Sequence, residues 1–359
     1  MKYEYGNDPA KIERYKKFWS RESVERPLVG FSFKSWFPLD EFKASASWAK
    51  DAPLTPNMVI PEDFLEDQEA LLREGETIDD DILRGACPAQ MLMWGDGMLG
   101  SAMKVLPGNV VAEYMNLSWE EMENIHFDRN APWFRKYIEF IDVLVKHAAG
   151  RYPVSHGMLN GPVDYLVTLR GHEQAVFDLM LEPEPTHVFL EKMGDFFIDV
   201  TKEAWKRIPL FHGGYFDAQY SLWAPEPITR LQEDALASLS PDIYRDFIKN
   251  IDERIGSHFG SAFMHLHSTS MMALDEILDI PTLKCFEVNN DVGGPPVATM
   301  IPYFQQIQNA HKSMLIRGSF TPDELRLVMD SLDPEGLYLY IMISDKKEID
   351  VLRPIVGMY

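Results

Sequence analysis

The feature that most constrains the fold of this chain is the alternation of short apolar runs with longer amphipathic stretches from about residue 132 onward. The apolar runs have the length of strands and occupy residues 153–158, 208–215, 262–267, 283–288, 313–317 and 337–343. Helical patterns lie at 133–147, 240–259 and 321–332, and the last two open with a hydroxyl residue followed by proline, which is typical of a helix start. Strands that alternate with helices in this way form a parallel sheet.

The number of runs favours a closed barrel over an open sheet. A further apolar run at 27–33 and one strand from the 90s region bring the expected strands to the eight of an α/β fold of the (β/α)8 TIM-barrel type. An open, doubly wound sheet is the alternative. Because the first 130 residues are irregular, we expect 1–359 to form a single barrel domain in which 38–130 are largely an insertion or extension around the first strands.

The charge balance excludes several classes of partner. The chain has 359 residues and a formal net charge of −22, with 34 Lys and Arg against 56 Asp and Glu. We expect no nucleic-acid partner, because non-specific affinity for nucleic acid comes from basic side chains that neutralise phosphates. We also expect no membrane association, since no stretch long and apolar enough to span a membrane is found. We expect a cytoplasmic protein, because no secretory signal is found and two cysteines, Cys87 and Cys285, are too few to stabilise this chain by disulfide bonds.

Two histidines form the sharpest candidate site. In a barrel the active site lies at the carboxyl ends of the strands, and His265 and His267 close one predicted strand. Residues two apart on a strand point to the same face, so both imidazoles can reach one metal ion. Glu287 or Cys285, on one face of the next strand, would supply a third ligand. The alternative is that one histidine hydrogen-bonds within the barrel and the other binds substrate without a metal.

Two other motifs are interpreted as non-functional. Residues 95–100 match Gly-x-Gly-x-x-Gly, but a dinucleotide site needs a long helix after these glycines and Pro107-Gly108 interrupts after six residues, so we expect a flexible loop bordering the pocket instead. Glu233 and Asp234 are adjacent and would face apart on a helix or strand. We therefore expect them to form a solvated face rather than a catalytic carboxylate pair.

Several stretches carry a resemblance to a known family. They are 159–171 with 178–183, then 233–247, and finally 264–270 followed by 274–280. Together they resemble the uroporphyrinogen decarboxylase family, which also contains zinc-dependent methyltransferases that act with methylcorrinoid proteins. The resemblance runs from about residue 26 to the C-terminus and is specific from residue 132 onward. It implies a (β/α)8 barrel with its pocket at the carboxyl ends of the strands.

The sequence departs from both branches of that family. The decarboxylases carry an arginine-rich stretch after the first strand that holds the propionates of the substrate, whereas residues 33–37 here contain the single cation Lys34. The methyltransferases hold zinc with a His-x-Cys pair and a later cysteine. His265 matches the histidine of that pair, His267 stands where the first cysteine would be, and Met342 lies in the region of the second.

The resemblance implies a methyltransferase-type one-carbon enzyme that acts on a small-molecule substrate, a methylcorrinoid protein, or both, with zinc as the metal. His265 and His267 would bind the metal or the substrate heteroatom, Glu287 would complete the set, and Asp217 would join them in catalysis. The residues expected to bind substrate are His156, Asn160, His212, Tyr215, Asn289 and Arg317. The alternative functions are uroporphyrinogen decarboxylation and non-catalytic tetrapyrrole binding.

Overall fold

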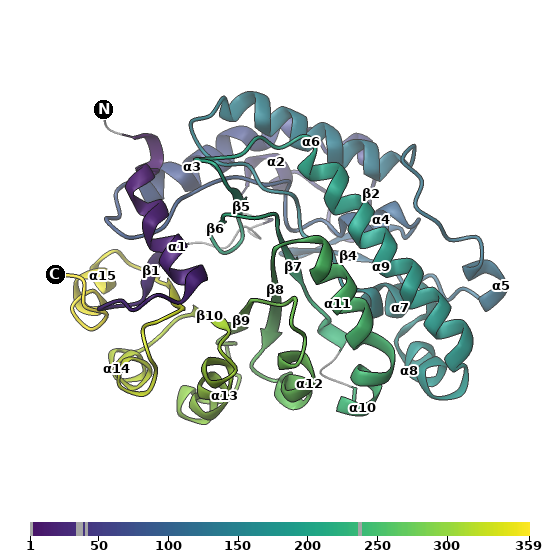
Figure 1. The fold of residues 1–359 in the computed structure, drawn as a ribbon. Coiled ribbons are helices and arrows are strands. Elements are labelled where there is room, and N and C mark those ends of the chain that lie inside the picture. The colour runs from purple at the N-terminus through teal and green to yellow at the C-terminus, as the bar shows by residue number, and fades with distance from the viewer. Residues whose placement is uncertain (1–2, 34–38, 40–41, 236–238) are drawn as a thin grey trace.

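A parallel sheet of six strands forms the centre of the fold (Figure 1). The strands lie in the order β1 (Leu28–Ser32), β11 (Leu337–Met342), β10 (Ser313–Gly318), β9 (Cys285–Asn289), β8 (Ser261–His267) and β7 (Ile228–Leu231). The computed structural model describes residues 3–33, 39, 42–235 and 239–359. Lys34 and most of the segment after the first strand lie outside the described residues.

Two extended segments fill the gap between β1 and β7. The backbone N–H of Asp81 donates to a β1 carbonyl at 3.0 Å, and Ala86 forms an isolated parallel bridge with Val154. The imidazole of His156 then lies beside the backbone of Ile228 in β7. These contacts continue the ring from β1 to β7. The fold is therefore the expected α/β barrel, with two of its strand positions taken by short extended segments.

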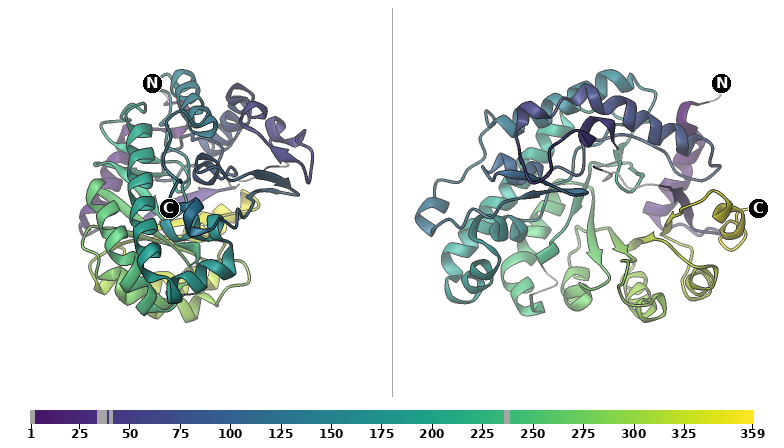
Figure 2. Two further views of the ribbon diagram at one scale, coloured as in Figure 1. Left: turned by 90° about the vertical axis from the view of Figure 1, so that its right-hand side faces the viewer. Right: turned by 180° about the vertical axis from the view of Figure 1, so that it is seen from behind.

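Helices cover the outside of this ring. They are α6 (Pro132–Ala148), α7 (Pro162–Arg170), α8 (His172–Leu181), α9 (Pro183–Trp205), α10 (Pro241–Ile243), α11 (Lys249–His258), α12 (Leu274–Leu278), α13 (Val297–Asn309), α14 (Pro322–Ser331) and α15 (Lys347–Leu352). In Figure 1 the helices from α11 to α15 follow one another around the sheet, and Figure 2 shows the same order from behind.

The predicted helix starts are confirmed by their caps. The Thr321 hydroxyl accepts from the N–H of Glu324 at 3.2 Å, the Glu324 carboxylate accepts from the N–H of Thr321 at 2.8 Å, and Pro322 occupies the first helical position. Ser240 caps α10 in the same manner, by accepting from the N–H of Ile243 at 3.3 Å. A π-helical turn, Tyr244–Ile248, then joins α10 to α11, so the predicted helix over 240–259 is present with a local irregularity.

Two strand predictions are wrong. Residues 208–215 do not form a barrel strand: only Tyr215 is in a strand, β5 (Tyr215–Asp217), which pairs antiparallel with β6 (Leu222–Ala224). The barrel strand of this region is β7, whose four residues include Arg230 and so lack a continuous apolar run. The strand expected from the 90s region is also absent, because Trp94–Met98 forms helix α4 and the barrel position belongs to the segment around Ala86.

The antiparallel pair β5–β6 packs inside the barrel near the amino ends of the strands. Its residues are buried with Phe263, Cys285 and Tyr338, which come from the barrel strands β8, β9 and β11. The Tyr338 hydroxyl donates to the carbonyl of Tyr220 at 2.8 Å, in the turn between β5 and β6. Helix α1 (Ile12–Ser20) covers the pair from outside, because the Tyr15 hydroxyl donates to the carbonyl of Ser221 at 2.6 Å. This end of the barrel is therefore filled by protein.

The segment predicted as an insertion contains its own small elements. These are α2 (Lys43–Ala46), α3 (Leu65–Glu76), α4, α5 (Trp119–Met122) and a three-stranded antiparallel sheet of β2 (Pro53–Leu54), β3 (Met103–Leu106) and β4 (Asn109–Ala112). The segment around Asp81 and Ala86 belongs to the barrel ring, however, so 38–130 are not insertion throughout. That 1–359 form one domain stays a prediction.

We expect the substitution Asp80→Ala to destabilise the fold strongly. Both carboxylate oxygens of Asp80 accept from Arg84, at 3.0 and 2.7 Å, and the two side chains are 0% and 8% exposed. Removing one partner leaves a buried uncompensated charge, which costs about 3–5 kcal/mol. The free energy of unfolding in urea measures this loss. Glu66→Ala is the control, because Glu66 pairs with Lys43 on the surface, and equal unfolding midpoints for the two variants would contradict the prediction.

Candidate functional site

A cavity of about 550 Å³ opens at the carboxyl ends of the barrel strands. Its polar lining residues are Tyr114, Asn160, Asp164, Thr168, His172, Gln219, Tyr220, Arg230, Gln232, Asp234, His265, His267, Asn289 and Arg317. Met93, Met158, Val167 and Ala235 give it an apolar side. The cavity therefore occupies the end of the barrel at which enzymes of this fold keep their chemistry.

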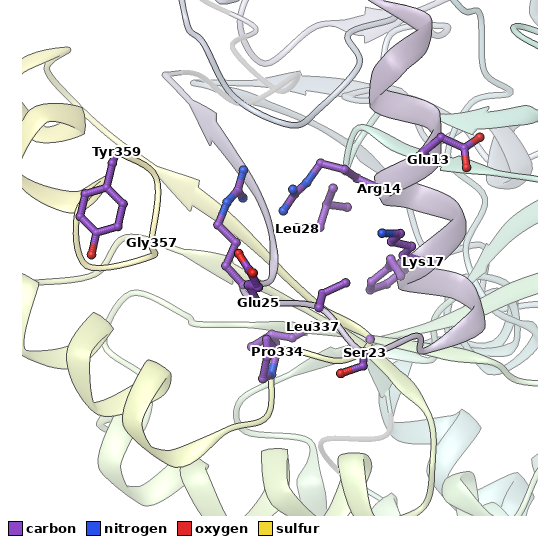
Figure 3. Close-up of a pocket in the computed structure, with 14 residues that line it drawn as sticks. Glu13, Arg14, Lys17, Ser23, Glu25, Leu28, Pro334, Leu337, Gly357 and Tyr359 are labelled. Atoms are coloured by element: carbon purple, nitrogen blue, oxygen red, sulfur yellow. The ribbon is translucent and has the colours of Figure 1, made fainter.

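A second cavity, of about 650 Å³, lies at the opposite end of the barrel between α1 and the start of β11 (Figure 3). Although it is larger, the arginines in its lining, Arg14 and Arg26, share the carboxylate of Asp81. The metal-ligating cluster that the structure brings together lies in the first cavity, not in this one. We therefore take the cavity at the carboxyl ends as the candidate site.

His265 and His267 lie side by side on β8. Their Nε2 atoms are 3.4 Å apart, and the two rings are inclined by 76°. The parallel register sets His265 opposite Glu287 and His267 opposite Asn289 on β9. Both imidazoles face the interior of the barrel because alternate residues of a strand point to the same side.

Asp234 completes a cluster of three metal-ligating side chains. One ligand atom from each of Asp234, His265 and His267 lies within 4.8 Å of the other two, and Asp234 Oδ1 is 3.8 Å from His267 Nε2. The second oxygen of Asp234 accepts from the side-chain amide of Gln232 at 3.2 Å. Two imidazole nitrogens and one carboxylate oxygen with space beside them are the ligand pattern of catalytic rather than structural zinc sites.

Each histidine is held from behind by a carboxylate. Glu287, which is fully buried, hydrogen-bonds His265 Nδ1, and Asp291 Oδ1 lies 2.9 Å from His267 Nδ1. The Tyr220 hydroxyl, 3.1 Å from His265 Nδ1, adds a further contact. A carboxylate on Nδ1 fixes the ring orientation and directs Nε2 toward the cavity, as in many metal sites.

This geometry corrects the expected ligand set. Glu287 was expected beside the two histidines as the third ligand, but it contacts the nitrogen of His265 that faces away from His267. An ion near both Nε2 atoms would therefore have Asp234, not Glu287, as its carboxylate neighbour. Cys285, the other candidate, is buried with the β5–β6 pair and is not part of the cluster.

The pKa of Asp291 reflects its position behind His267. Burial raises this pKa, but hydrogen bonds from His267 and from the hydroxyl and backbone N–H of Ser268 outweigh that effect and hold it below its usual value. Asp291 is thus kept as an anion. In that form it stabilises a proton on His267 Nδ1 and leaves Nε2 as the free lone pair.

Three of the predicted substrate-binding residues line the cavity, namely Asn160, Asn289 and Arg317. Asn160 accepts from the side-chain amide of Gln232 at 3.1 Å and donates to Asp96 at 2.8 Å, so it stands behind the residue that bonds Asp234. Arg317 donates to the side-chain oxygen of Asn289 at 3.0 Å. These side chains are placed where a bound small molecule would meet them.

The other predicted residues do not reach the cavity. His156 is buried against Trp205, with ring centroids 5.2 Å apart, and Tyr215 packs on the same indole. His212 lies 3.3 Å from the carbonyl of Asn7, in the loop before β5. Two of these residues were misplaced because 208–215 is not a barrel strand.

Asp217 is likewise buried below the cavity rather than within it. Its carboxylate accepts from the N–H of Tyr220 at 3.0 Å, and burial raises its pKa to about 6 although Arg230 acts in the opposite direction. Asp217 therefore shapes the turn that carries Tyr220. A direct part in catalysis would require a contact that this geometry does not provide.

The sequence analysis assigned Asp234 to a solvated face and did not single out its neighbours Arg230 and Gln232. All three belong to β7 or follow it directly, and β7 was not recognised as a strand. Once β7 is placed, its carboxyl end carries Gln-Glu-Asp in the position where a barrel keeps reactive side chains. The expected solvated face holds for Asp234, which is exposed, but not for Glu233, which is 3% exposed and accepts from the N–H of Val163 at 3.1 Å.

Comparisons with known proteins give the fold and no family. No protein-family model matches the chain, and no curated protein matches its sequence. Among solved structures the chain is similar to a methyltransferase from Methanosarcina mazei, with a TM-score of 0.61 and 13% identity over 96% of this chain and 97% of that one. At this identity the likeness supports the barrel fold. None of the helices in the described part is both long and apolar enough to cross a membrane.

We expect the stability of the protein to depend on His156 in acid. Burial lowers the pKa of His156 from 6.5 to about 4. Between these values the unfolded chain binds a proton that the folded chain does not, so the free energy of unfolding decreases as the pH falls, by roughly 3 kcal/mol in total. Urea unfolding at a series of pH values measures this contribution as the difference between wild type and His156→Phe. An identical pH dependence in both proteins would contradict it.

Proposed function

We propose that this protein is a zinc-dependent methyltransferase-type enzyme that moves a methyl group between a small-molecule substrate and a methylcorrinoid protein. The observation that carries the proposal is the cluster of His265, His267 and Asp234 in the cavity at the carboxyl ends of the strands. The resemblance to the uroporphyrinogen decarboxylase family and the shared fold with a solved methyltransferase agree with it.

The ligand set fits zinc. Imidazole nitrogen and carboxylate oxygen are both zinc ligands, and catalytic zinc sites use three protein ligands with the fourth position left for substrate or water. Glu287 and Asp291 behind the histidines match the outer carboxylates that such sites use. When bound, zinc supplies a Lewis acid that stabilises negative charge on the heteroatom from which a methyl group departs.

The side chains of this chain have separate tasks in that reaction. His265, His267 and Asp234 would hold the ion, which would supply Lewis-acid stabilisation to the substrate heteroatom. The carbon–heteroatom bond breaks with its electron pair kept on the heteroatom, and the methyl carbon forms its new bond with an electron pair of the acceptor. No oxidant or reductant is consumed. Asn160 and Gln232 keep Asp234 in position through their hydrogen bonds.

We expect purified wild-type protein to bind about one zinc ion per chain at neutral pH. His267→Ala and Asp234→Asn should each weaken zinc binding by more than about tenfold, and Glu287→Gln should weaken it by about 10- to 100-fold through loss of ring orientation. Titration with zinc against a chromogenic chelator measures these affinities. His126→Ala is the matched control, because His126 is exposed and bonds only the nearby carbonyl of Asn124. Unchanged zinc affinity in the first two variants would refute the metal site.

Methyl transfer itself is tested with free cobalamins. The zinc-loaded protein is mixed either with methylcobalamin and a panel of small thiols, or with reduced cobalamin and a panel of methyl ethers. Absorbance reports loss or formation of the cobalt–methyl bond. A rate above background that His267→Ala abolishes and His126→Ala retains supports the proposal, and equal rates in all three proteins contradict it.

We expect no release of coproporphyrinogen from uroporphyrinogen. The substrate carries many carboxylates, whereas the described lining of the cavity offers Arg230 and Arg317 as its guanidinium groups beside the carboxylates of Asp164 and Asp234. Carboxylates that are not paired with cations are not fixed in the geometry that decarboxylation requires. An anaerobic assay with separation of the porphyrins measures the product. Steady coproporphyrinogen release would instead support the decarboxylase alternative.

A further inference from the structure

Arg317 presents a guanidinium to the cavity that the protein does not neutralise. The side chain is half-buried, and its recorded hydrogen bond is the one from Nη1 to the amide oxygen of Asn289 at 3.0 Å. Arginine has five N–H donors in a planar fork, so most of this fork remains available. Among the described residues, no carboxylate forms an ion pair with Arg317.

Two buried arginines outside the cavity are paired with carboxylates, whereas Arg230, which also lines the cavity, donates to the neutral side chains of Gln219, Tyr220 and Gln232. Arg84 binds both oxygens of Asp80, and Arg170 binds both oxygens of Asp178, with the carboxylates fully buried in each pair. The chain has an excess of acidic residues, with a net charge of −22. The arginines without a carboxylate partner among the described cavity residues, Arg230 and Arg317, therefore point to a negative charge supplied from outside, and Arg317 has more of its N–H donors available.

Asp291, the acidic residue that contacts Asn289, already has hydrogen-bond donors for both of its carboxylate oxygens. Asp291 bonds the side chain of Asn289, but its two oxygens also accept from His267 and from Ser268. The side-chain oxygen of Asn289 accepts from Arg317 and its side-chain N–H donates to Asp291, so a neutral amide lies between the two charges. The guanidinium is held in place by an amide and its charge is not cancelled.

The strand register places Arg317 at a useful distance from the metal-ligating cluster. Arg317 pairs with Asn289, and Asn289 pairs with His267, on three successive parallel strands. Neighbouring strands lie about 4.8 Å apart, so the backbones of Arg317 and His267 are separated by roughly 10 Å. A small molecule that lies across these strands can contact the guanidinium at one end and the histidine nitrogens at the other, because all three residues line the same cavity.

We propose that the substrate of this site carries a carboxylate, which binds the free fork of Arg317 while the heteroatom that bears the methyl group lies at the His265–His267–Asp234 cluster. Arg317 matches a carboxylate through two parallel hydrogen bonds, which a neutral substrate cannot form. Met93 and Met158 on the apolar side of the cavity would contact the carbon frame between the two ends. The inference rests on the proposed function for the identity of the second end.

The test compares 4-methoxybenzoate with 4-methoxybenzamide, which has the same frame without the charge. Binding to the full chain is measured by calorimetry with and without zinc. We expect the carboxylate to bind about 10- to 100-fold more tightly than the amide, since hydrogen bonds to a charged group are the stronger ones. Arg317→Gln should remove this preference and Arg317→Lys should retain part of it. Arg326→Gln is the control, because Arg326 is exposed on α14 and pairs with Asp323.

Equal affinities for the two probes, binding of neither, or a preference that persists in Arg317→Gln would overturn the inference. A preference for the carboxylate that Arg317→Gln removes supports it even if zinc does not bind, and in that case the proposed function fails alone. Zinc binding and methyl transfer without any carboxylate preference would leave the proposed function in place and refute this inference alone.

Discussion

The candidate site depends on the pairing of each histidine on β8 with a carboxylate on its Nδ1 side. Glu287 lies opposite His265 in the register of β8 and β9, and Asp291 follows the end of β9 beside His267. With both Nδ1 atoms engaged, both Nε2 atoms point to the same place, and Asp234 from the neighbouring strand region meets them there. A shift of β8 by one residue would turn both histidines to the other face of the sheet.

The sequence predicts the frame of this arrangement because its signals are local. The apolar runs that became β8 to β11, the helix caps at Ser240 and Thr321 and the shared face of His265 and His267 all follow from neighbouring residues. Local sequence patterns do not tell which residue from a distant part of the chain a given side chain contacts. Glu287 was expected as a ligand because the alternation of side chains along its strand places it on the required face. That alternation does not tell which imidazole nitrogen of His265 the carboxylate contacts.

Three of the remaining errors have a common origin in the segment between α9 and β8. Here a run of strand-like residues forms the antiparallel β5–β6 pair inside the barrel, while the short β7 carries the barrel position. Burial among residues that come from other strands decides this outcome, and no local pattern encodes it. Because β7 was not recognised as the barrel strand, His212 and Tyr215 were misplaced and Asp234 was interpreted as part of a solvated face.

The filling of the amino end of the barrel by β5, β6 and α1 also restricts the order of events at the site. Since the cavity opens at the carboxyl ends, a small substrate and a protein partner would have to use the same opening. A partner large enough to cover that opening would block further entry while it remained bound. Under the proposed function, the kinetic mechanism is therefore ordered, with the small molecule arriving first and the protein partner leaving before the next small molecule can exchange.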